Sequence, residues 1–318
     1  MRQTRGRQTS PARVFQIVAT PGSGNGRALA TAHRLREALR ARGHRTELEV
    51  FADLTRLARW AATDRAPFSL LICVGGDGTL DTAARAAVRR SVPLLAVSSG
   101  FGNLFARALR QPSRVDRALH LLEHGEVVHV DVGVRNGDLF LCQESFGFLA
   151  DIQTRTETNG HPRSRWRRGL AYYQTALRHL QDTPLSSMRV AVDGQVVARD
   201  AVIVTVANVE TYGPWLNLTP DASPMDGLLD VFVMRRERKR DILAALLGRQ
   251  LRLPVTRAGA LVQRGQHVSV TVAHRVRHDM EVMPHRLPVL VSSRTAEALA
   301  HDRLRAGGFS AVRGRQVA

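Results

Sequence analysis

The stretch Leu70-Leu71-Ile72-Cys73-Val74-Gly75-Gly76-Asp77-Gly78-Thr79 decides the fold of this chain of 318 residues. It opens with a continuous apolar run, which is typical of a strand buried on both faces of a parallel sheet. The glycines that follow let a backbone approach a ligand closely, and an alanine-rich helix is predicted from Thr79 to Arg90. The free N–H groups and positive dipole end of a helix favour an anion, so the stretch predicts a phosphate-binding loop.

Asp77 is the unusual residue of this loop. A carboxylate beside a phosphate group is repelled unless Mg²⁺ or a proton lies between them. In an ordinary strand-to-helix turn, the same Asp77 would instead cap the helix. The residues of the loop leave both interpretations open.

Two further glycine-rich turns follow predicted strands. Thr20-Pro21-Gly22-Ser23-Gly24 comes after the strand predicted at 14–19, and Ser98-Ser99-Gly100-Phe101-Gly102-Asn103 comes after the strand predicted at 93–97. Because strands and helices alternate, this part of the chain predicts an α/β domain with a parallel sheet. Loops after parallel strands gather at one edge of the sheet, so the three loops predict a single nucleotide-sized cleft.

The pattern changes near residue 127, where turn residues begin to separate short apolar runs. Such a pattern predicts a mostly antiparallel β domain. The runs lie at 127–132, 188–192, 201–207 and 228–234, and the turns lie at Asn136-Gly137, Asp193-Gly194 and Asp226-Gly227. One helix is predicted within this half, at 169–180. We therefore predict an N-terminal nucleotide-binding α/β domain over residues 13–126, a C-terminal β-rich domain over residues 127–300, and flexible tails at 1–12 and 305–318.

The charge of the chain is strongly positive, with 46 Lys and Arg residues against 28 Asp and Glu residues and a net charge of +18. Such a field attracts nucleotide phosphates, nucleic acid or an anionic membrane surface. Aromatic residues make up 5% of the chain, which offers few stacking platforms for bases. No specific nucleic-acid partner is predicted, whereas anionic lipids suit the charge.

The expected cellular location rests on the small number of cysteines and on the lack of a long apolar segment. The two cysteines, Cys73 and Cys142, do not suggest a disulfide framework, which suits a reducing compartment. No apolar run approaches the roughly 18 residues of a membrane span, and the basic N-terminus lacks the apolar segment of a signal peptide. We expect a cytoplasmic protein whose charge would allow peripheral binding at the inner face of the membrane.

Six motifs in a fixed order resemble the diacylglycerol kinase catalytic family, which includes bacterial lipid kinases and the sphingosine and ceramide kinases. The resemblance covers roughly residues 13–295 and rests on the order and spacing of the motifs together. They are Thr20-Pro21-Gly22-Ser23-Gly24, Gly75-Gly76-Asp77-Gly78-Thr79-Leu80, Gly100-Phe101-Gly102-Asn103-Leu104-Phe105-Ala106-Arg107, Ser145-Phe146-Gly147-Phe148-Leu149-Ala150-Asp151, Arg168-Gly169-Leu170-Ala171-Tyr172-Tyr173 and Pro220-Asp221-Ala222-Ser223-Pro224-Met225-Asp226-Gly227-Leu228-Leu229-Asp230-Val231.

The resemblance implies a lipid kinase with a C-terminal domain that is β-sandwich-like. ATP would lie against the glycine loops, and Mg²⁺ would assist transfer of its γ-phosphoryl group to a diacylglycerol-like hydroxyl at a membrane surface. A structural Mg²⁺ would be held by Asp226 and the backbone carbonyls of Ser223 and Leu228. The oligomeric state is left open, with a dimer among the options. The implied nucleotide-binding residues are Thr20, Ser23, Gly24, Gly75, Gly76, Asp77, Gly78, Thr79, Gly102 and Asn103.

Three positions differ from the family pattern. Asp279-Met280-Glu281 stands where the family has Asp-Gly-Glu, whose acid accepts the proton of the lipid hydroxyl. Thr20 replaces an Asn, and Phe101 replaces a Thr. The resemblance implies that Asp77, Asp279 and Glu281 are the catalytic residues, and a non-catalytic nucleotide- or lipid-binding member of the fold is the alternative. An NAD kinase is a further hypothesis, because that family shares the Gly-Gly-Asp-Gly-Thr loop.

Overall fold

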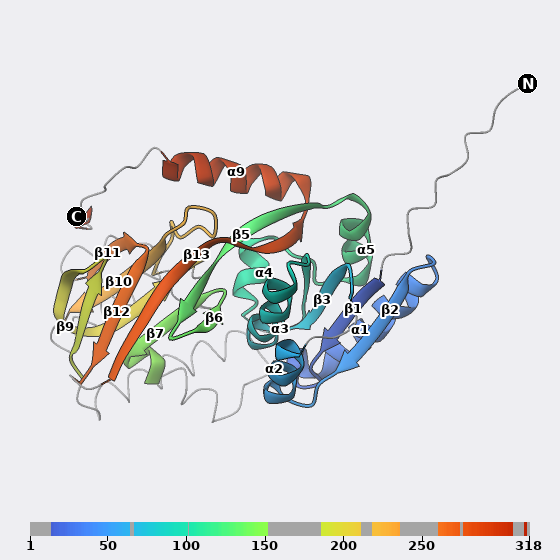
Figure 1. Cartoon of the computed structure of the whole chain (residues 1–318), viewed down its shortest axis with the longest axis horizontal. Helices are drawn as coiled ribbons and strands as arrows, with labels where there is room; N and C mark the ends of the chain where they lie inside the picture. Colours follow the sequence, from blue (N-terminus) through green and yellow to red (C-terminus); the bar gives the residue numbers. More distant parts are fainter. Residues whose placement is uncertain are drawn as a thin grey trace, which may run out of the picture. The chain divides into compact units, whose positions relative to one another are not determined.

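A computed structural model of the chain describes residues 14–63, 67–100, 102–151, 186–210, 218–235, 260–273, 276–307 and 315–316 (Figure 1). The chain forms two compact units, unit 1 from Met1–His129 with Leu287–Glu297, and unit 2 from Val130–Arg286 with Ala298–Ala318. The segment Leu287–Glu297 lies within the range 127–300 predicted for the C-terminal domain, but it belongs to unit 1. The helix predicted at 169–180 lies outside the described residues, as do residue Phe101 and the expected N-terminal tail.

Unit 1 contains the predicted parallel sheet. Its strand order is β2-β1-β3-β4, and the C-terminal end of β13 pairs in parallel with β4 through Val289 and Leu94. Every residue of β3 is buried, as the continuous apolar run predicted. The strands are β1 (Val14–Ala19), β2 (Arg45–Val50), β3 (Leu70–Gly75) and β4 (Leu94–Ser98).

Helices connect these strands and close the core of unit 1. Alternating Ala and Leu residues of α1 and α5 pack with Phe15, Ile17 and Ile72 of the sheet in one buried cluster. The Asp53 carboxylate accepts a hydrogen bond from the Arg56 backbone N–H at 2.8 Å and so begins α2. The elements are η1 (Ser23–Gly26), α1 (Arg27–Arg40), α2 (Leu54–Ala62), α3 (Asp77–Arg90), α4 (Leu104–Ala108) and α5 (Val115–His124).

Unit 2 is a mostly antiparallel β structure, as predicted. Its strands follow the order β14-β11-β10-β9-β8-β12-β13, while β7 pairs with β9, β5 pairs with β13, and β6 pairs with β5. The strands are β5 (Glu126–Arg135), β6 (Asp138–Phe140), β7 (Gln143–Gly147), β8 (Met188–Val192), β9 (Gln195–Ala207), β10 (Leu229–Arg235), β11 (Ala260–Gly265), β12 (His267–Val272), β13 (Val276–Val291) and β14 (Arg315–Gln316). A last helix, α9 (Ser293–Gly307), follows β13. β14 and the end of α9 fall within the range 305–318 expected as a tail.

Two hairpin turns form where the sequence placed them. Asn136 and Gly137 have φ values of +49° and +90°, and Asp193 and Gly194 have +48° and +80°. Positive φ at both central residues is the geometry that Asn-Gly and Asp-Gly pairs favour in two-residue hairpins. Local turn chemistry therefore fixes the register of β5 with β6 and of β8 with β9.

The buried side chain of Gln111 joins β4 to β13 within unit 1. Its Oε1 accepts a hydrogen bond from the Ala96 backbone N–H at 3.0 Å, and its Nε2 donates to the Leu290 carbonyl at 2.9 Å. One amide side chain satisfies both backbone groups, because it carries an acceptor oxygen and a donor NH₂ group.

Gln111→Leu should lower the free energy of unfolding, because it leaves the Ala96 N–H and the Leu290 carbonyl buried without partners. Each orphaned group costs about 1–3 kcal/mol. Urea unfolding monitored by circular dichroism measures the loss, with Gln195→Leu at an exposed site of β9 as the control. Equal unfolding midpoints for the two variants would contradict the bridging role of Gln111.

Candidate functional site

The hydroxyl group of Thr79 links the first two glycine loops. Its Oγ1 lies 2.8 Å from Thr20 Oγ1 and 3.2 Å from Ser23 Oγ, while the Thr20 and Ser23 hydroxyls are 2.8 Å apart. Thr20 and Thr79 are both buried. The cluster brings together the end of β1 and the start of α3, which are 59 residues apart in the sequence.

The third glycine loop lies directly against the second. The Ser99 N–H donates to the Gly75 carbonyl at 2.9 Å. A Cβ added to Gly100 would lie 2.6 Å from the Gly76 Cα and 2.9 Å from the Asn103 Oδ1. Only glycine therefore allows the two loop backbones to touch at this point.

The carboxylate of Asp77 holds the second and third loops together. It accepts hydrogen bonds from the backbone N–H groups of Asn103, Leu104 and Phe105, which belong to the start of α4. Burial raises the pKa of Asp77, while these hydrogen bonds and the positive charge of Arg107 lower it. The helix that Asp77 itself begins, α3, has Gly76 as its N-cap and no side-chain cap. Asp77 therefore caps the helix of the neighbouring loop, which neither interpretation of the sequence included.

All ten predicted nucleotide-binding residues lie in unit 1, at or after the carboxyl ends of β1, β3 and β4. Gly24 is part of η1. The sequence did not indicate that Leu54 is a neighbour of this cluster. A Cβ on Gly78 would lie 3.3 Å from Leu54 Cδ1. Leu54 is 45% exposed, so it offers apolar surface beside the loop. Nucleotide binding by these residues stays a prediction.

The Asp226-Gly227 turn, predicted to hold a structural cation, lies in a group of buried carboxylates in unit 2. Asp226 Oδ1 accepts a hydrogen bond from the Leu228 N–H at 3.0 Å. Burial, and then the charge of Asp230, raise the pKa of Asp226 to about 7. Burial also raises the pKa of Asp230 to about 6, although Arg264 opposes the shift. Both shifts follow first from burial, which penalises the charged form of a carboxylate.

A divalent cation fits the donor groups of this site. Asp226 and Asp230 lie near the Arg264 guanidinium, whose Nε is 3.0 Å from Asp230 Oδ1, and Asp131 Oδ1 lies 3.6 Å from His285 Nδ1. Burial penalises the negative charge of all three carboxylates, and a divalent cation would offset that cost. Asp230 Oδ2 and Ser223 Oγ are buried without a hydrogen-bond partner in the described structure. Carboxylate and carbonyl oxygens are the ligands that Mg²⁺ prefers.

Backbone carbonyls must complete any such cation site. Within the described ranges, no three His, Cys, Asp or Glu side chains are arranged to hold a metal ion by themselves. The use of the Ser223 and Leu228 carbonyls as ligands stays a prediction. The sequence analysis missed Asp131, whose Oδ2 accepts the Gly227 N–H at 2.8 Å from 96 residues away. Asp230 lies only four residues after Asp226, so the sequence indicated its proximity to Asp226 better than that of Asp131.

Mg²⁺ should stabilise unit 2 against heat, and Asp226→Asn should remove that effect. A ligand at 100 times its Kd adds about 2.7 kcal/mol to the free energy of unfolding. Without metal, the variant should unfold at a higher temperature than the wild type, because one buried charge has been removed. Calorimetry in EDTA and in MgCl₂ measures both effects, with Asp200→Asn at an exposed position of β9 as the control. The same response to Mg²⁺ in wild type and Asp226→Asn would exclude this cation site.

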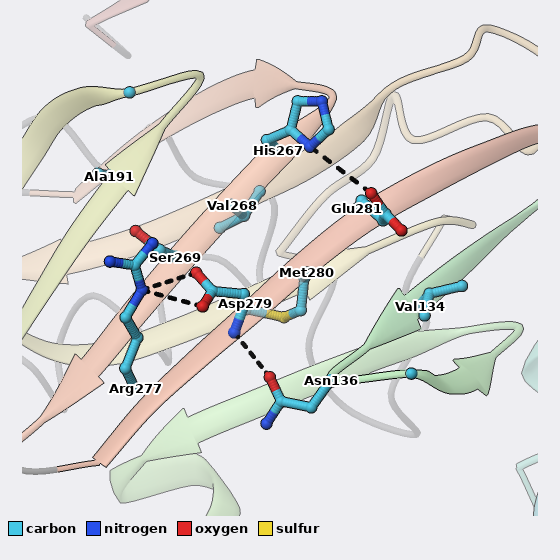
Figure 2. Close-up of a pocket in the computed structure, with 12 residues that line it drawn as sticks. Val134, Asn136, Ala191, His267, Val268, Ser269, Arg277, Asp279, Met280 and Glu281 are labelled. Atoms are coloured by element: carbon cyan, nitrogen blue, oxygen red, sulfur yellow. Dashed lines mark hydrogen bonds and ion pairs between the residues drawn. The ribbon is translucent and has the colours of Figure 1, made fainter.

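The predicted catalytic acids Asp279 and Glu281 lie in unit 2, on the exposed face of β13, whereas Asp77 belongs to unit 1. Both line an open pocket of about 410 Å³ formed by turns and strands of unit 2 (Figure 2). Met280, between them, points into the core of unit 2. The segment is thus part of a continuous strand with alternating faces. The catalytic role of Asp77, Asp279 and Glu281 stays a prediction.

The fold and these loops define a class of two-domain kinases, and family comparison identifies the group within it. The family model "Diacylglycerol kinase catalytic domain" matches residues 15–134, and "YegS C-terminal NAD kinase beta sandwich-like domain" matches residues 145–296. The chain belongs to the diacylglycerol kinase catalytic-domain family of bacterial lipid kinases. Its C-terminal half is β-sandwich-like, as the resemblance implied, and phosphoryl transfer is the general activity of the family.

Relatives and solved structures agree with this assignment. The chain is 24% identical over 237 residues to a diacylglycerol kinase of Bacillus subtilis (strain 168), covering 71% of each chain. It is 26% identical over 232 residues to one of Mycobacterium tuberculosis (strain CDC 1551 / Oshkosh), covering 71% of this chain and 74% of the relative. A crystal structure of a diacylglycerol kinase from Bacillus anthracis str. Sterne shares the fold, with a TM-score of 0.63 at 18% identity over 90% of this chain and 100% of that one.

Proposed function

We propose that the protein is an ATP- and Mg²⁺-dependent lipid kinase that phosphorylates the hydroxyl of a diacylglycerol-like lipid. The observation that carries the proposal is the contact of three glycine loops around Thr79 and Asp77 in unit 1. Close backbones, buried hydroxyls and a helix N-terminus suit a chain of phosphates. The relatives are named diacylglycerol kinase, and we therefore propose a lipid hydroxyl as the acceptor.

The residues of unit 1 would bind and position the phosphate donor. Backbone N–H groups at the start of α3 would donate to phosphate oxygens, and the hydroxyls of Thr20, Ser23 and Thr79 would add further donors. Mg²⁺, when bound, neutralises charge on the transferred phosphoryl group. Asp77 would orient that site, and the three N–H groups that bind its carboxylate support this role.

Unit 2 would supply the acceptor side and contact the membrane. The net charge of +18 favours an anionic lipid surface, consistent with a peripheral position at the inner face of the membrane. Among the described helices, none is both long and apolar enough to cross a membrane.

Transfer of label from γ-labelled ATP to lipid vesicles tests the proposal. We expect labelled product with Mg²⁺ and diacylglycerol in anionic vesicles, and none with EDTA or with triacylglycerol, which has no free hydroxyl. Parallel reactions offer monoacylglycerol, ceramide, sphingosine and NAD as acceptors. Transfer to NAD alone would replace the lipid kinase by an NAD kinase.

A non-catalytic member of the fold is the second candidate. Asp279 is paired with Arg277 inside a regular strand, which is an unusual setting for a proton acceptor. Binding of Mg-ATP or lipid without transfer to any acceptor would favour this candidate.

A further inference from the structure

The pocket in unit 2 has walls that are fixed by hydrogen bonds. Asp279 is held by Asn136, because its N–H donates to Asn136 Oδ1 at 2.9 Å and its carbonyl accepts the Asn136 N–H at 3.0 Å. Asp193 Oδ1 accepts the N–H groups of Gln266 and His267, both at 2.9 Å. A ligand would therefore meet side chains whose backbone is already ordered, which lowers the entropic cost of binding.

The charges that line this pocket favour a neutral ligand. Arg277 Nε donates to Asp279 Oδ1 and Oδ2 at 2.8 and 3.0 Å, so the guanidinium is already paired. Glu281 adds a second carboxylate. One guanidinium against two carboxylates leaves one negative charge, which a protonated His267 would only balance. An anion therefore gains nothing here, and the net charge of +18 over the whole chain opposes a cation.

His267 and Glu281 are separated by a gap that fits a hydroxyl group. They are cross-strand partners in the β12–β13 ladder, and His267 Nδ1 lies 3.9 Å from Glu281 Oε2 (Figure 2). This separation is too long for a direct hydrogen bond. A hydroxyl is donor and acceptor at once, so it can accept from the ring and donate to the carboxylate. The two side chains are 68% and 55% exposed, so both are open to a ligand.

A second cross-strand pair on the same face offers similar chemistry. Ser269 and Asp279 lie opposite each other in the ladder, two positions along from the first pair. Strand geometry separates successive pairs on one face by about 7 Å. The Ser269 hydroxyl can donate or accept, and the Asp279 carboxylate keeps acceptor capacity beside its ion pair. The two pairs together suit several hydroxyl groups on one carbon skeleton.

Apolar and small residues complete the pocket. Val134 and Ala191 line it beside the polar groups, as do Gly137 and Gly194 of the two hairpin turns. The C–H groups of a carbon skeleton would pack against the two apolar side chains. The volume of about 410 Å³ is in the range of sites that bind small molecules.

We propose that this pocket binds a neutral polyol, which is either a free sugar or the sugar headgroup of a glycolipid. One hydroxyl of the ligand bridges His267 and Glu281, and others contact Ser269 and Asp279. The inference goes beyond the proposed kinase function, because it requires no phosphoryl transfer and no residue of unit 1.

Saturation-transfer NMR with methyl glucoside and the full chain tests binding of a free sugar. We expect a signal with the wild type, and a Kd at least about tenfold higher in Ser269→Val and in Glu281→Ala, because each variant loses a hydrogen-bond partner of the ligand. Thr271→Val is the matched control, since Thr271 lies two residues from Ser269 on the same strand but outside the pocket. Its Kd should equal that of the wild type.

Vesicle flotation tests recognition of the same sugar on a lipid. If the ligand is a glycolipid, phosphatidylcholine vesicles that contain monoglucosyl diacylglycerol should retain more wild-type protein than plain phosphatidylcholine vesicles. Ser269→Val should abolish this difference, and Thr271→Val should keep it. Saturation transfer without such retention would assign the pocket to free sugars.

Three results would overturn the proposal. The first is equal affinity in Ser269→Val and Thr271→Val, and the second is neither saturation transfer nor added retention with the wild type. The third is binding of glycerol phosphate or ethanolamine in place of methyl glucoside, which would exclude a neutral ligand. Thermal unfolding of each variant shows whether a loss reflects misfolding. Because none of these measurements uses ATP, failure of the proposed kinase activity would leave this test unaffected.

Discussion

Asp77→Asn should lower kcat/KM for Mg-ATP about 10²- to 10³-fold, the range found when one preorganised electrostatic contact is removed from a transition state. Two effects combine. The negative charge that would serve Mg-ATP is lost, and the amide presents an NH₂ group toward the backbone N–H donors of Asn103, Leu104 and Phe105. The third loop would then be held less firmly against the second.

Stability should change much less than activity in Asp77→Asn. Burial raises the pKa of Asp77, so the folded protein holds this charge at a cost that the amide removes. The loss of hydrogen bonds offsets that gain, and we expect a net change within about 1 kcal/mol. Titration calorimetry with Mg-ATP, the vesicle assay and urea unfolding together separate binding, transfer and folding.

Asp116→Asn is the matched control for Asp77→Asn, because Asp116 also lies in the first turn of a helix of unit 1 but its side chain is 62% exposed. Its activity should equal that of the wild type. If Asp77→Asn keeps full activity, the carboxylate has only its capping role, and the assignment of Asp77 as a catalytic residue fails.

Gly100→Ala should disrupt the contact between the second and third loops. The new Cβ would lie 2.6 Å from the Gly76 Cα, and a backbone atom cannot move aside as the end of a side chain can. Forcing an extra methyl group into such a contact costs about 1–3 kcal/mol. Because Gly76 begins the helix behind the phosphate loop, we expect Kd for Mg-ATP to rise at least about tenfold, equivalent to 1.4 kcal/mol.

Gly22→Ala provides the control for folding, since a Cβ at Gly22 meets nothing within 4 Å. Its unfolding midpoint should stay close to that of the wild type. Urea unfolding and titration calorimetry with Mg-ATP measure both variants. Wild-type stability and affinity in Gly100→Ala would show that the loops have room to separate, contrary to the packing described above.

Much of the fold was predictable because its signals are local. The apolar run 70–74 indicated a buried parallel strand, and β3 is buried throughout. Asn136-Gly137 and Asp193-Gly194 predicted hairpins, because each pair tolerates the positive φ that a two-residue turn needs. The glycine loops were visible because glycine permits close backbone approach, as Gly100 shows against Gly76.

The partners of Asp77, Asp131 and Glu281 came only from the tertiary structure. Asp77 reaches the start of α4, and Asp131 reaches a turn 96 residues further along the chain. Strand pairing alone places His267 beside Glu281 and turns Met280 into the core.

The sequence by itself therefore determined the alternating strands and helices of unit 1, their order, and two hairpin turns of unit 2, whereas phosphate binding by the glycine loops stays a prediction. The tertiary structure decided the distant partners: the N–H groups at the start of α4 for Asp77, the Gly227 N–H for Asp131 and an imidazole for Glu281. The physical reason is range. Backbone propensity acts over a few residues, whereas the charge and solvation of a side chain depend on neighbours that packing brings from distant parts of the chain.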